Sequence, residues 1–428
     1  MPRSLDDWLD YQQRVHPRAI ALGLDRVRAV WDALGAPMPA RTVITVGGTN
    51  GKGSTVAFLE AMLRADGRRV GAYTSPHLLR YNERVRIDGA DASDLSLIAA
   101  FERIEAARGD IELTYFEYGT LAALLLFAEA DLDVALLEVG LGGRLDAVNI
   151  VDADASIVTT VDLDHQDWLG NDRDSIGREK AGIFRTAKPA ILGETSPPRG
   201  LLDAAQRSGP DLRIAGRDFR IDREADGWRW QSGDVVLRLP PLSLDAICQP
   251  ANAGAAIAAL HALRRSLGWN PRAIERGVAS AHVAARLQRF ASAPELIVDV
   301  AHNPQAARAL AESLAARPSR GNTIAVFGAL ADKDVAGIVE SLHAAVAQWH
   351  LVGLARESAR GLDERSLRER MRSTPAEGAI CDSHADTASA LASTFASARD
   401  EDRVVAFGSF FIAADALRFA QARGFASA

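Results

Sequence analysis

The chain has 428 residues, of which 48% are hydrophobic and 25% charged, so two or three domains with sizeable cores are expected. A net charge of −7 argues against nucleic acid or a membrane surface as partner, because such partners bind a basic face. No secretory signal or membrane-spanning run of roughly 20 apolar residues is evident, and a cytoplasmic location is expected. Cys248 and Cys381 lack metal-ligand spacing and are expected to be buried thiols.

Ser4 and Asp7 form a capping-box pattern that predicts a first helix, and a second helix is expected over residues 24–34. Short apolar runs then alternate with helical segments. Such continuous apolar strands are typical of a parallel sheet covered on both faces. The sequence therefore predicts a P-loop-type parallel sheet domain with strands at residues 43–46, 70–74, 134–139, 157–161 and 190–192.

The sequence pattern then changes to short strands separated by turns, and antiparallel strands are expected at residues 219–222, 228–230 and 235–239. They predict a small β appendage, and an alanine-rich helix is expected after it over residues 252–267. The α/β rhythm restarts near Glu295, with strands expected at residues 296–300, 323–327, 351–354 and 404–407. The predicted fold class is α/β, with a first domain over 1–290 and a C-terminal Rossmann-like α/β domain over 291–428.

Residues 43–54 pass from an apolar strand into a glycine-rich turn that contains Lys52 and Ser54. Consecutive backbone N–H groups there can surround phosphate oxygens at the N-terminus of the next helix. Lys52 would reach the outer phosphates and Ser54 could hold magnesium. The spacing departs from G-x-x-x-x-G-K-[ST], because Val46 stands at the first glycine and Gly53 separates the lysine from the hydroxyl. A plain turn before a helix is the alternative, but it needs neither Lys nor Ser.

Polar side chains follow two further strands. Glu138 ends one of them, at the carboxyl edge where ligands of parallel sheets bind, and is the natural magnesium ligand. His165 follows another strand and is either a metal ligand or a structural hydrogen-bonding group. Lys180 lies in a charged segment for which a solvated helix face is the alternative interpretation. Gly140-Leu141-Gly142-Gly143 only weakly suggests a dinucleotide fingerprint, since its third glycine would fall on Leu145.

Six motifs occur in one order along the chain: residues 48–54, 74–78, 138–147, 164–165, 179–183 and 299–304. In this order and spacing, the chain resembles the folylpolyglutamate synthase/dihydrofolate synthase family of the wider Mur ligase superfamily. The resemblance extends from the first helix to Phe410. It implies an ATP-dependent amide ligase that joins L-glutamate to 7,8-dihydropteroate, and further glutamates to tetrahydrofolates, through an acyl phosphate. Domain closure near Arg286 would exclude water from that intermediate.

The resemblance also implies roles for individual residues. The catalytic residues would be Lys52, Glu138, His165 and Lys180. Of the two lysines, Lys180 matches the one that this family carbamylates. Magnesium would be held by Ser54, Ser75, Glu138, His165 and Lys180, with two ions expected and a monovalent cation as a further candidate. The ATP contacts would be Thr49, Asn50, Gly51, Lys52, Gly53, Ser54, Asn252, Arg286, Asp299 and His302.

The hinge and substrate contacts carry departures from the family pattern. The stretch 285–288 replaces a more common Pro-Gly-Arg-Phe, and Arg289 competes with Arg286 for the arginine role. Ala21 stands where relatives often have Asp. Phe116 offers a stacking face for a flat heterocycle, with a plain core aromatic as the alternative. The pterin contacts implied are Ile20, Ala21, Leu22, Gly23, Thr114, Tyr115, Phe116, Glu117, Leu145, Asp146 and Ala147.

Glutamate contacts are less well marked. Lys333 and Ser409 follow strands of the second domain and could receive an α-carboxylate, although solvated loop residues are the alternative. Only small-molecule partners are expected, and the chain is expected to be a monomer. Two other functions remain open from the residues: a related ligase that acts on a cell-wall precursor, and a nucleotide-gated switch without ligation. The switch would need the phosphate loop but not Glu138, His165 and Lys180 together.

Overall fold

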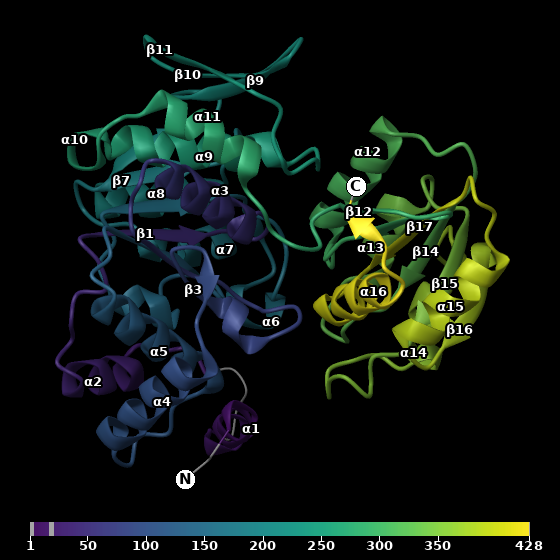
Figure 1. Cartoon of the computed structure of the whole chain (residues 1–428), viewed down its shortest axis with the longest axis horizontal. Helices are drawn as coiled ribbons and strands as arrows, with labels where there is room; N and C mark the ends of the chain where they lie inside the picture. The colour runs from purple at the N-terminus through teal and green to yellow at the C-terminus, as the bar shows by residue number, and fades with distance from the viewer. Residues whose placement is uncertain (1–3, 17–20, 428) are drawn as a thin grey trace. The chain divides into compact units, whose positions relative to one another are not determined.

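The computed structural model describes residues 4–16 and 21–427. The chain divides into two compact units, each with its own sheet (Figure 1). The first unit comprises Met1–Ser243 and Gln249–His282, and the second comprises Leu244–Cys248 and Val283–Ala428. The boundary therefore lies before residue 290, because the strand that contains residue 290 pairs within the second sheet.

An eight-stranded sheet forms the centre of the first unit, in the order β4-β3-β2-β5-β1-β6-β7-β8. Strands β2, β5, β1, β6, β7 and β8 run parallel, whereas β3 and β4 form an antiparallel edge. The parallel sheet agrees with the prediction. The strands are β1 (Thr42–Gly47), β2 (Val70–Tyr73), β3 (Val85–Ile87), β4 (Ala90–Asp91), β5 (Val134–Glu138), β6 (Ala155–Val158), β7 (Pro189–Leu192) and β8 (Asp211–Ile214).

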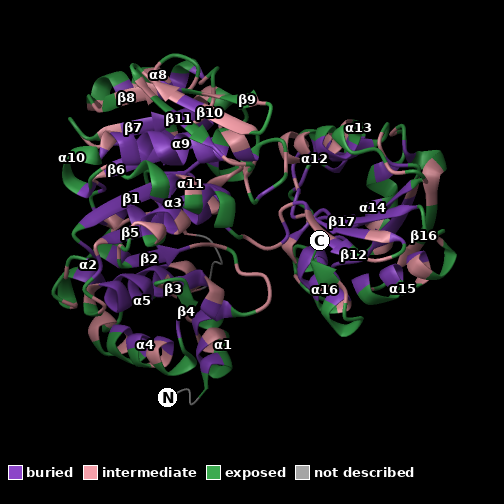
Figure 2. Cartoon of the chain, turned by 45° about the horizontal axis from the view of Figure 1, so that its top comes forward, coloured by how far each residue is buried: buried purple, intermediate pink, exposed green. Residues whose placement is uncertain are grey.

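Helices cover both faces of this sheet, so its central strands are buried along their whole length (Figure 2). Helices α3 and α9 pack on one face and α5 packs against β2 on the other. The predicted capping box of Ser4 and Asp7 is present at α1. The helices are α1 (Leu5–Val15), α2 (Asp25–Ala33), α3 (Lys52–Ala65), α4 (Asp94–Arg108), α5 (Tyr115–Glu129), α6 (Gln166–Leu169), α7 (Arg173–Lys180), α8 (Arg199–Ser208), α9 (Gln249–Ala262), α10 (Arg264–Leu267) and α11 (Pro271–Ser280), with 3₁₀ turns η1 (Tyr81–Arg84), η2 (Ala147–Ile150) and η3 (Ala181–Ile183).

The predicted β appendage is an antiparallel sheet of β9 (Arg220–Glu224), β10 (Gly227–Ser232) and β11 (Val235–Leu239). It belongs to the first unit. Trp230 of β10 is fully buried, and its indole N–H donates to the carbonyl of Gly254 in α9 at 3.1 Å. The appendage is thereby fastened to the helix that also contains Asn252.

The second unit contains a seven-stranded sheet in the order β16-β15-β14-β17-β13-β12-β18. Its strands β13 to β17 are parallel, and the neighbouring strands β14, β15 and β17 contribute a buried aromatic cluster of Phe327, Trp349 and Phe407. The α/β class is confirmed for both units. The elements are β12 (Gln288–Ala291), β13 (Glu295–Val298), α12 (Pro304–Ala316), β14 (Thr323–Phe327), α13 (Val335–Leu342), β15 (Gln348–Val352), α14 (Glu364–Met371), η4 (Glu377–Ala379), β16 (Ile380–His384), α15 (Thr387–Ser397), β17 (Arg403–Phe407), α16 (Phe410–Ala422) and β18 (Ala426–Ser427).

A short segment, Leu244–Cys248, belongs to the second unit although the chain on both sides of it belongs to the first. The backbone N–H of Ile247 donates to Ser313 Oγ at 3.1 Å, and Asp245 pairs with Arg317 at 2.8 Å. Cys248 and Cys381 are both exposed, so the prediction of buried thiols was wrong. Among the described residues, none of the helices has the length and apolar character needed to cross a bilayer.

Candidate active site

Four neighbouring parallel strands, β2, β5, β1 and β6, end at the same edge of the first sheet. Ser75 follows β2, Glu138 ends β5, the glycine-rich turn follows β1, and His165 lies beyond β6. The predicted phosphate and metal residues are therefore brought to one edge by strand order alone, although they span more than a hundred residues of sequence. This is the edge at which open parallel sheets bind ligands.

The turn after β1 has the backbone geometry of a phosphate-binding loop. Gly51 has φ 87°, and a Cβ placed there would lie 2.3 Å from Asn252 Oδ1, so only glycine fits. Helix α3 begins directly after it, at Lys52. The Lys52 ammonium donates to the carbonyl oxygens of Gly48 and Thr49, each at 3.1 Å. Lys52 is thus held against the loop whose N–H groups would face phosphate.

Helix α9 supports this loop from one side. Gln249 Nε2 donates to Ser54 Oγ at 3.3 Å, and Asn252 Nδ2 donates to Gln249 Oε1 at 3.0 Å. All three side chains are buried. The structure thus brings the predicted Asn252 to Gly51 and Ser54. Gln249 was missed from the sequence, although its position one turn before Asn252 on the same helical face was a usable signal.

The end of β6 supports the loop from the other side. Thr159 Oγ1 donates to the carbonyl of Asn50 at 2.6 Å, and the N–H of Asn50 donates to Thr160 Oγ1 at 3.1 Å. A Cβ at Gly48 would lie 1.9 Å from Thr159 Oγ1. Sequence reasoning treated Thr159 and Thr160 as part of a strand over 157–161, but β6 ends at Val158 and the two hydroxyls bond to the loop instead.

Ser75 and Glu138 meet at this edge. The N–H of Ser75 donates to Glu138 Oε2 at 3.1 Å, and the carboxylate is buried. Such hard oxygen ligands suit magnesium, which keeps several waters and substrate phosphates in its shell. His165 is the N-cap of α6 and has a left-handed conformation, with φ 51°. The described residues contain no group of three or more His, Cys, Asp and Glu that could hold a metal without such additional ligands.

Lys180 is only 3% exposed, so the interpretation as a solvated helix face was wrong. Burial, with a smaller contribution from Lys52, lowers the Lys180 pKa to about 7, against the attraction of Asp164 and Asp146. A large share of its amine is therefore uncharged near neutral pH. An uncharged, buried amine is the form that reacts with carbon dioxide, as the predicted carbamylation requires.

Asp146 organises the loop that follows β5. Its carboxylate accepts the N–H groups of Leu141 at 2.8 Å and Val148 at 3.1 Å. Burial raises the Asp146 pKa to about 6, while these N–H groups and Lys52 oppose that rise. We call residues 140–147 the glycine loop. The Asp146 side chain is occupied by this loop, so any substrate contact there shares the carboxylate with two backbone N–H groups.

The three segments assigned to the pterin lie together. The N–H of Gly23 donates to the Leu145 carbonyl at 3.4 Å, and Arg26 Nη2 donates both to the Ala21 carbonyl at 2.8 Å and to Glu117 at 3.0 Å. Thr114 and Glu117 also form a capping box at the start of α5. Ile20 lies outside the described residues. Arg26, which joins two of the segments, was not predicted.

The Phe116 ring lies over the glycine loop and also packs against the edge of the core. A Cβ at Gly140 would lie 2.7 Å from Phe116 Cζ, and the half-buried Phe116 ring is 5.9 Å from that of Tyr73. Arg84, also not predicted, lies 5.3 Å from the ring centroid of Tyr81 and 5.4 Å from that of Tyr115. Leu22 and Ala147 complete the predicted set, half-buried and buried respectively.

In the second unit, Arg286 and His302 both lie against the ring of Phe410, and the carboxylate of Asp299 interacts electrostatically with both. The guanidinium of Arg286 lies 5.8 Å from the Phe410 ring centroid, and the His302 ring lies 6.0 Å from it. Asp299 accepts the N–H groups of Leu287 and Ala301, each at 2.7 Å, and burial raises its pKa against the attraction of Arg286.

The hydrogen-bond partners of Arg286 distinguish it from Arg289, the other candidate for the arginine role. Its Nε is buried without a hydrogen-bond partner among the described residues, whereas Arg289 is paired with Glu295. A buried donor left without a partner usually has an unseen ligand or water. The assignment to Arg286 is thus favoured over Arg289.

Lys333 and Ser409 follow β14 and β17, which are neighbours in the second sheet. Both residues are buried, so the interpretation as solvated loop residues was wrong. Ser409 Oγ accepts the N–H of Ile412 at 3.1 Å and caps α16, which leaves its hydroxyl hydrogen available. Lys333 Nζ lies 3.7 Å from the Asp332 carboxylate.

Known proteins can now be compared with this geometry. The Mur ligase middle domain model matches residues 46–209, and the model of the Mur ligase, glutamate ligase domain, matches residues 285–410. The dihydrofolate synthase/folylpolyglutamate synthase of Escherichia coli (strain K12) is 46% identical over 419 residues, which cover 98% of this chain and 96% of the relative. That of Haemophilus influenzae (strain ATCC 51907 / DSM 11121 / KW20 / Rd) is 40% identical and covers 96% of each chain.

Solved structures agree. E. coli FolC in complex with DHPP and ADP superposes with a TM-score of 0.92 at 45% identity over 99% of each chain. A bifunctional folylpolyglutamate synthase/dihydrofolate synthase with Mn, AMPPNP and L-glutamate bound gives 0.89 at 44% identity, over 97% of this chain and 98% of that chain. The fold and the site thus define an ATP-dependent ligase of the Mur type. The chain belongs to the dihydrofolate synthase/folylpolyglutamate synthase family, which confirms the resemblance drawn from the motifs.

Proposed function

We propose that the chain joins L-glutamate to 7,8-dihydropteroate, giving dihydrofolate, and adds further glutamates to tetrahydrofolates, with ATP as the energy source. One observation carries this proposal: the phosphate loop, the Ser75–Glu138 pair and Lys180 lie at the sheet edge beside the three joined pterin segments. The complexes of its relatives with ADP, DHPP and L-glutamate support the same chemistry.

The reaction needs activation because a carboxylate is a poor electrophile and its oxygen a poor leaving group. We propose that a carboxylate oxygen of the pteroate attacks the γ-phosphorus of ATP in line, and the bond to ADP breaks. The glutamate amine then attacks the acyl carbon, phosphate leaves and the amine loses a proton. Lys52 offsets charge on the γ-phosphoryl group, while Phe116 stacks on the pterin and Arg26 holds the pterin segments together.

Magnesium, when bound, would neutralise charge on the transferred phosphoryl group. Glu138, Ser75, Ser54 and His165 are the residues proposed to hold it, and the Mn complex of a relative supports the use of a divalent cation. The uncharged amine of Lys180 fits carbamylation, which would give a carboxylate for a second ion. A monovalent cation is a further candidate ligand.

Asn252, Arg286, Asp299 and His302 are proposed as contacts of the nucleotide, and Lys333 with Ser409 as contacts of glutamate. The unpartnered Nε of Arg286 and the free hydroxyl hydrogen of Ser409 support these roles. We further propose that the chain acts as a monomer in the cytoplasm, where ATP and folates are available.

Mass spectrometry of products tests the proposal. Purified protein is incubated with ATP and glutamate together with dihydropteroate or with tetrahydrofolate, and each component is omitted in turn. We expect a single glutamate added to dihydropteroate and one or more added to tetrahydrofolate. Carboxylate labelled with ¹⁸O should transfer one label to the released phosphate. Phosphate release that depends on a UDP-linked acid would favour the cell-wall alternative, and nucleotide binding without any acid-dependent turnover would favour a switch.

A further inference from the structure

Two segments of the first unit interlock beside the proposed catalytic centre: the glycine loop and residues 179–185. A Cβ at Gly143 would lie 2.9 Å from the Glu179 carbonyl oxygen, and one at Gly182 would lie 2.3 Å from Arg144 Cβ. The N–H of Arg144 donates to the Glu179 carbonyl at 2.9 Å. Backbone therefore approaches backbone, and glycine at both positions allows the approach.

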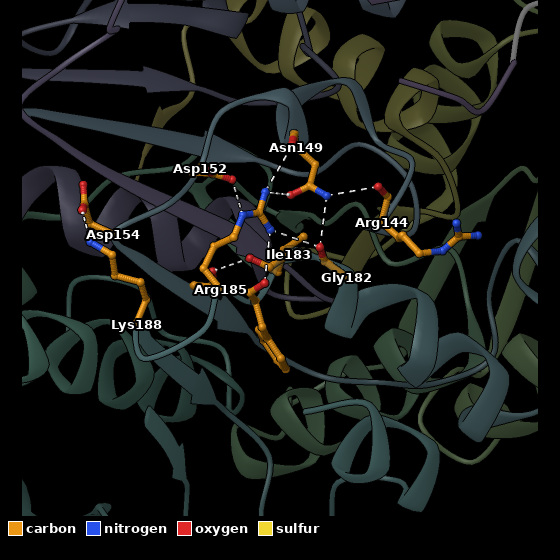
Figure 3. A network of polar contacts seen from close by, with 10 residues as sticks. Arg144, Asn149, Asp152, Asp154, Gly182, Ile183, Arg185 and Lys188 are labelled. Atoms are coloured by element: carbon orange, nitrogen blue, oxygen red, sulfur yellow. Dashed lines mark hydrogen bonds and ion pairs between the residues drawn. The ribbon is translucent and has the colours of Figure 1, made fainter. Parts of the chain in front are cut away.

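The side chains of Asn149 and Arg185 connect these two segments (Figure 3). The buried Asn149 Nδ2 donates to the carbonyls of Arg144 and Gly182, each at 3.1 Å, so one amide joins both segments. Arg185 Nη2 donates to Asn149 Oδ1 at 2.9 Å, and its Nη1 donates to the Gly182 carbonyl at 3.3 Å. We call these two side chains the Asn149–Arg185 staple.

Each segment held by the staple also contains a residue of the proposed site. Asp146, three residues before Asn149, fixes the shape of the glycine loop. Lys180 lies five residues before Arg185, at the end of α7, and a Cβ at Gly143 would lie 3.1 Å from Lys180 Cα. The staple thus sets the distance between the backbone of Lys180 and the loop beneath Phe116.

We infer that Asn149 and Arg185 are positioning residues that hold Lys180 in place for carbamylation and for its role in ligation. Neither residue belongs to the proposed substrate contacts. The inference rests on the proposed function of Lys180. An error of about 1 Å in the position of a catalytic group can lower a rate about 100-fold. Loss of the staple that holds the Lys180 segment is therefore expected to lower the rate of ligation.

The network offers matched controls. Asp152, the outer partner of Arg185, is 85% exposed at its side chain and bonds to neither Gly182 nor Arg144 in the described contacts. The Lys188 side chain pairs with Asp154 at 2.9 Å, apart from the staple (Figure 3). Asp152→Asn and Lys188→Ala should therefore leave the position of Lys180 unchanged.

The experiment compares Asn149→Ala, Arg185→Ala and the conservative Arg185→Lys with these controls. A lysine cannot reproduce the forked contacts of Arg185 and should not rescue. We expect kcat to fall by about 10- to 100-fold with the KM for ATP within about twofold. In ¹³C NMR with ¹³C-bicarbonate, the staple variants should need several-fold more bicarbonate for half-maximal carbamate at Lys180. Both controls should match the parent protein.

Thermal unfolding and circular dichroism of each variant separate positioning from folding. A parallel loss of kcat, ATP binding and folded fraction would reduce the staple to a purely structural role and overturn the inference. So would unchanged kcat and unchanged carbamate in folded Asn149→Ala and Arg185→Lys. Lys180→Ala tests the underlying assignment separately: full activity in that variant would remove the proposed role of Lys180, whatever the staple variants do.

Discussion

Glu138 gives the clearest prediction for a single residue. Its buried carboxylate accepts the Ser75 N–H, and glutamine keeps that acceptor and the side-chain shape while it removes the charge. We expect Glu138→Gln to lower kcat about 100-fold or more, because a ligand charge beside the transferred phosphoryl group is lost. Steady-state kinetics and a thermal melt measure activity and fold. Asp131→Asn, at the exposed amino-terminal side of β5, is the control. Near-normal turnover in Glu138→Gln would refute the metal assignment.

Lys180 predicts a pH dependence of stability. Its pKa in the folded chain is about 7 against an ordinary value of 10.5, mainly because it is buried. Between those values the unfolded chain binds a proton that the folded chain does not, so the free energy of unfolding rises with pH across this window. Below about pH 7 the lysine is protonated in both states and its contribution no longer changes.

Lys180→Met should remove this rise. Urea unfolding in bicarbonate-free buffer at several pH values from 7 to 10 gives the comparison, and the informative quantity is the difference between parent and variant. We expect that difference to change steadily with pH and to favour the variant most at the low end. Parallel curves would mean that the folded chain holds Lys180 with an ordinary pKa.

At the scale of elements, the sequence predicted the buried parallel strands because each is a continuous apolar run. Strands β3, β4, β8, β12, β16 and β18 were missed, since they are short or lie at polar, partly exposed edges. The strand expected over 157–161 ends early because Thr159 and Thr160 turn to the phosphate loop. A threonine is compatible both with a strand and with a turn whose hydroxyl bonds to a neighbouring loop, and only its hydrogen-bond partner distinguishes the two.

Prediction of the site is limited in the same way, because contacts between distant segments leave no local pattern in the sequence. Residues that belong to a local motif, such as Lys52 in residues 48–54 and Glu138 in residues 138–147, could be predicted from that motif and from strand order. Arg26 and Arg84 could not, because Glu117 and Tyr115, which they contact, lie far away in the sequence and only the folded chain brings them together. Gln249 could have been found from its position one turn before Asn252, but its contact with Ser54 could not. The family resemblance supplied most of the pterin segments, but not the arginine that joins them.

Arg26 therefore provides a prediction about how elements are joined. Arg26→Met removes the hydrogen bonds to Ala21 and Glu117 while it keeps the aliphatic stem. Loss of a charge-assisted hydrogen bond worth about 1.5–3 kcal/mol should raise the KM for dihydropteroate roughly 10-fold and leave the KM for ATP unchanged. Arg28→Met, an exposed neighbour on α2, is the matched control. Equal effects on both KM values would place Arg26 in general stability instead.

At the scale of the whole molecule, each unit has its own core, and the segment Leu244–Cys248 is a distinctive link. Ser313→Ala removes the acceptor of the Ile247 N–H. We expect a local loss of about 1 kcal/mol, which corresponds to roughly 5-fold faster proteolysis at this segment if cleavage follows local opening. Limited proteolysis with mass spectrometry measures it, and Ser397→Ala, on α15, is the control. Unchanged cleavage would mean that this hydrogen bond does not hold the segment.

That link also constrains how such a protein can be rearranged. The polypeptide enters the second unit at Leu244, returns to the first at Gln249 and crosses again at Val283. A gene fusion that replaced everything after residue 282 with a relative's sequence would leave the five original residues of this segment against the incoming helix α12. Recombination that exchanges the glutamate-ligase half cleanly must therefore carry two separate stretches of coding sequence, so the halves are expected to be inherited together more often than a single junction would suggest.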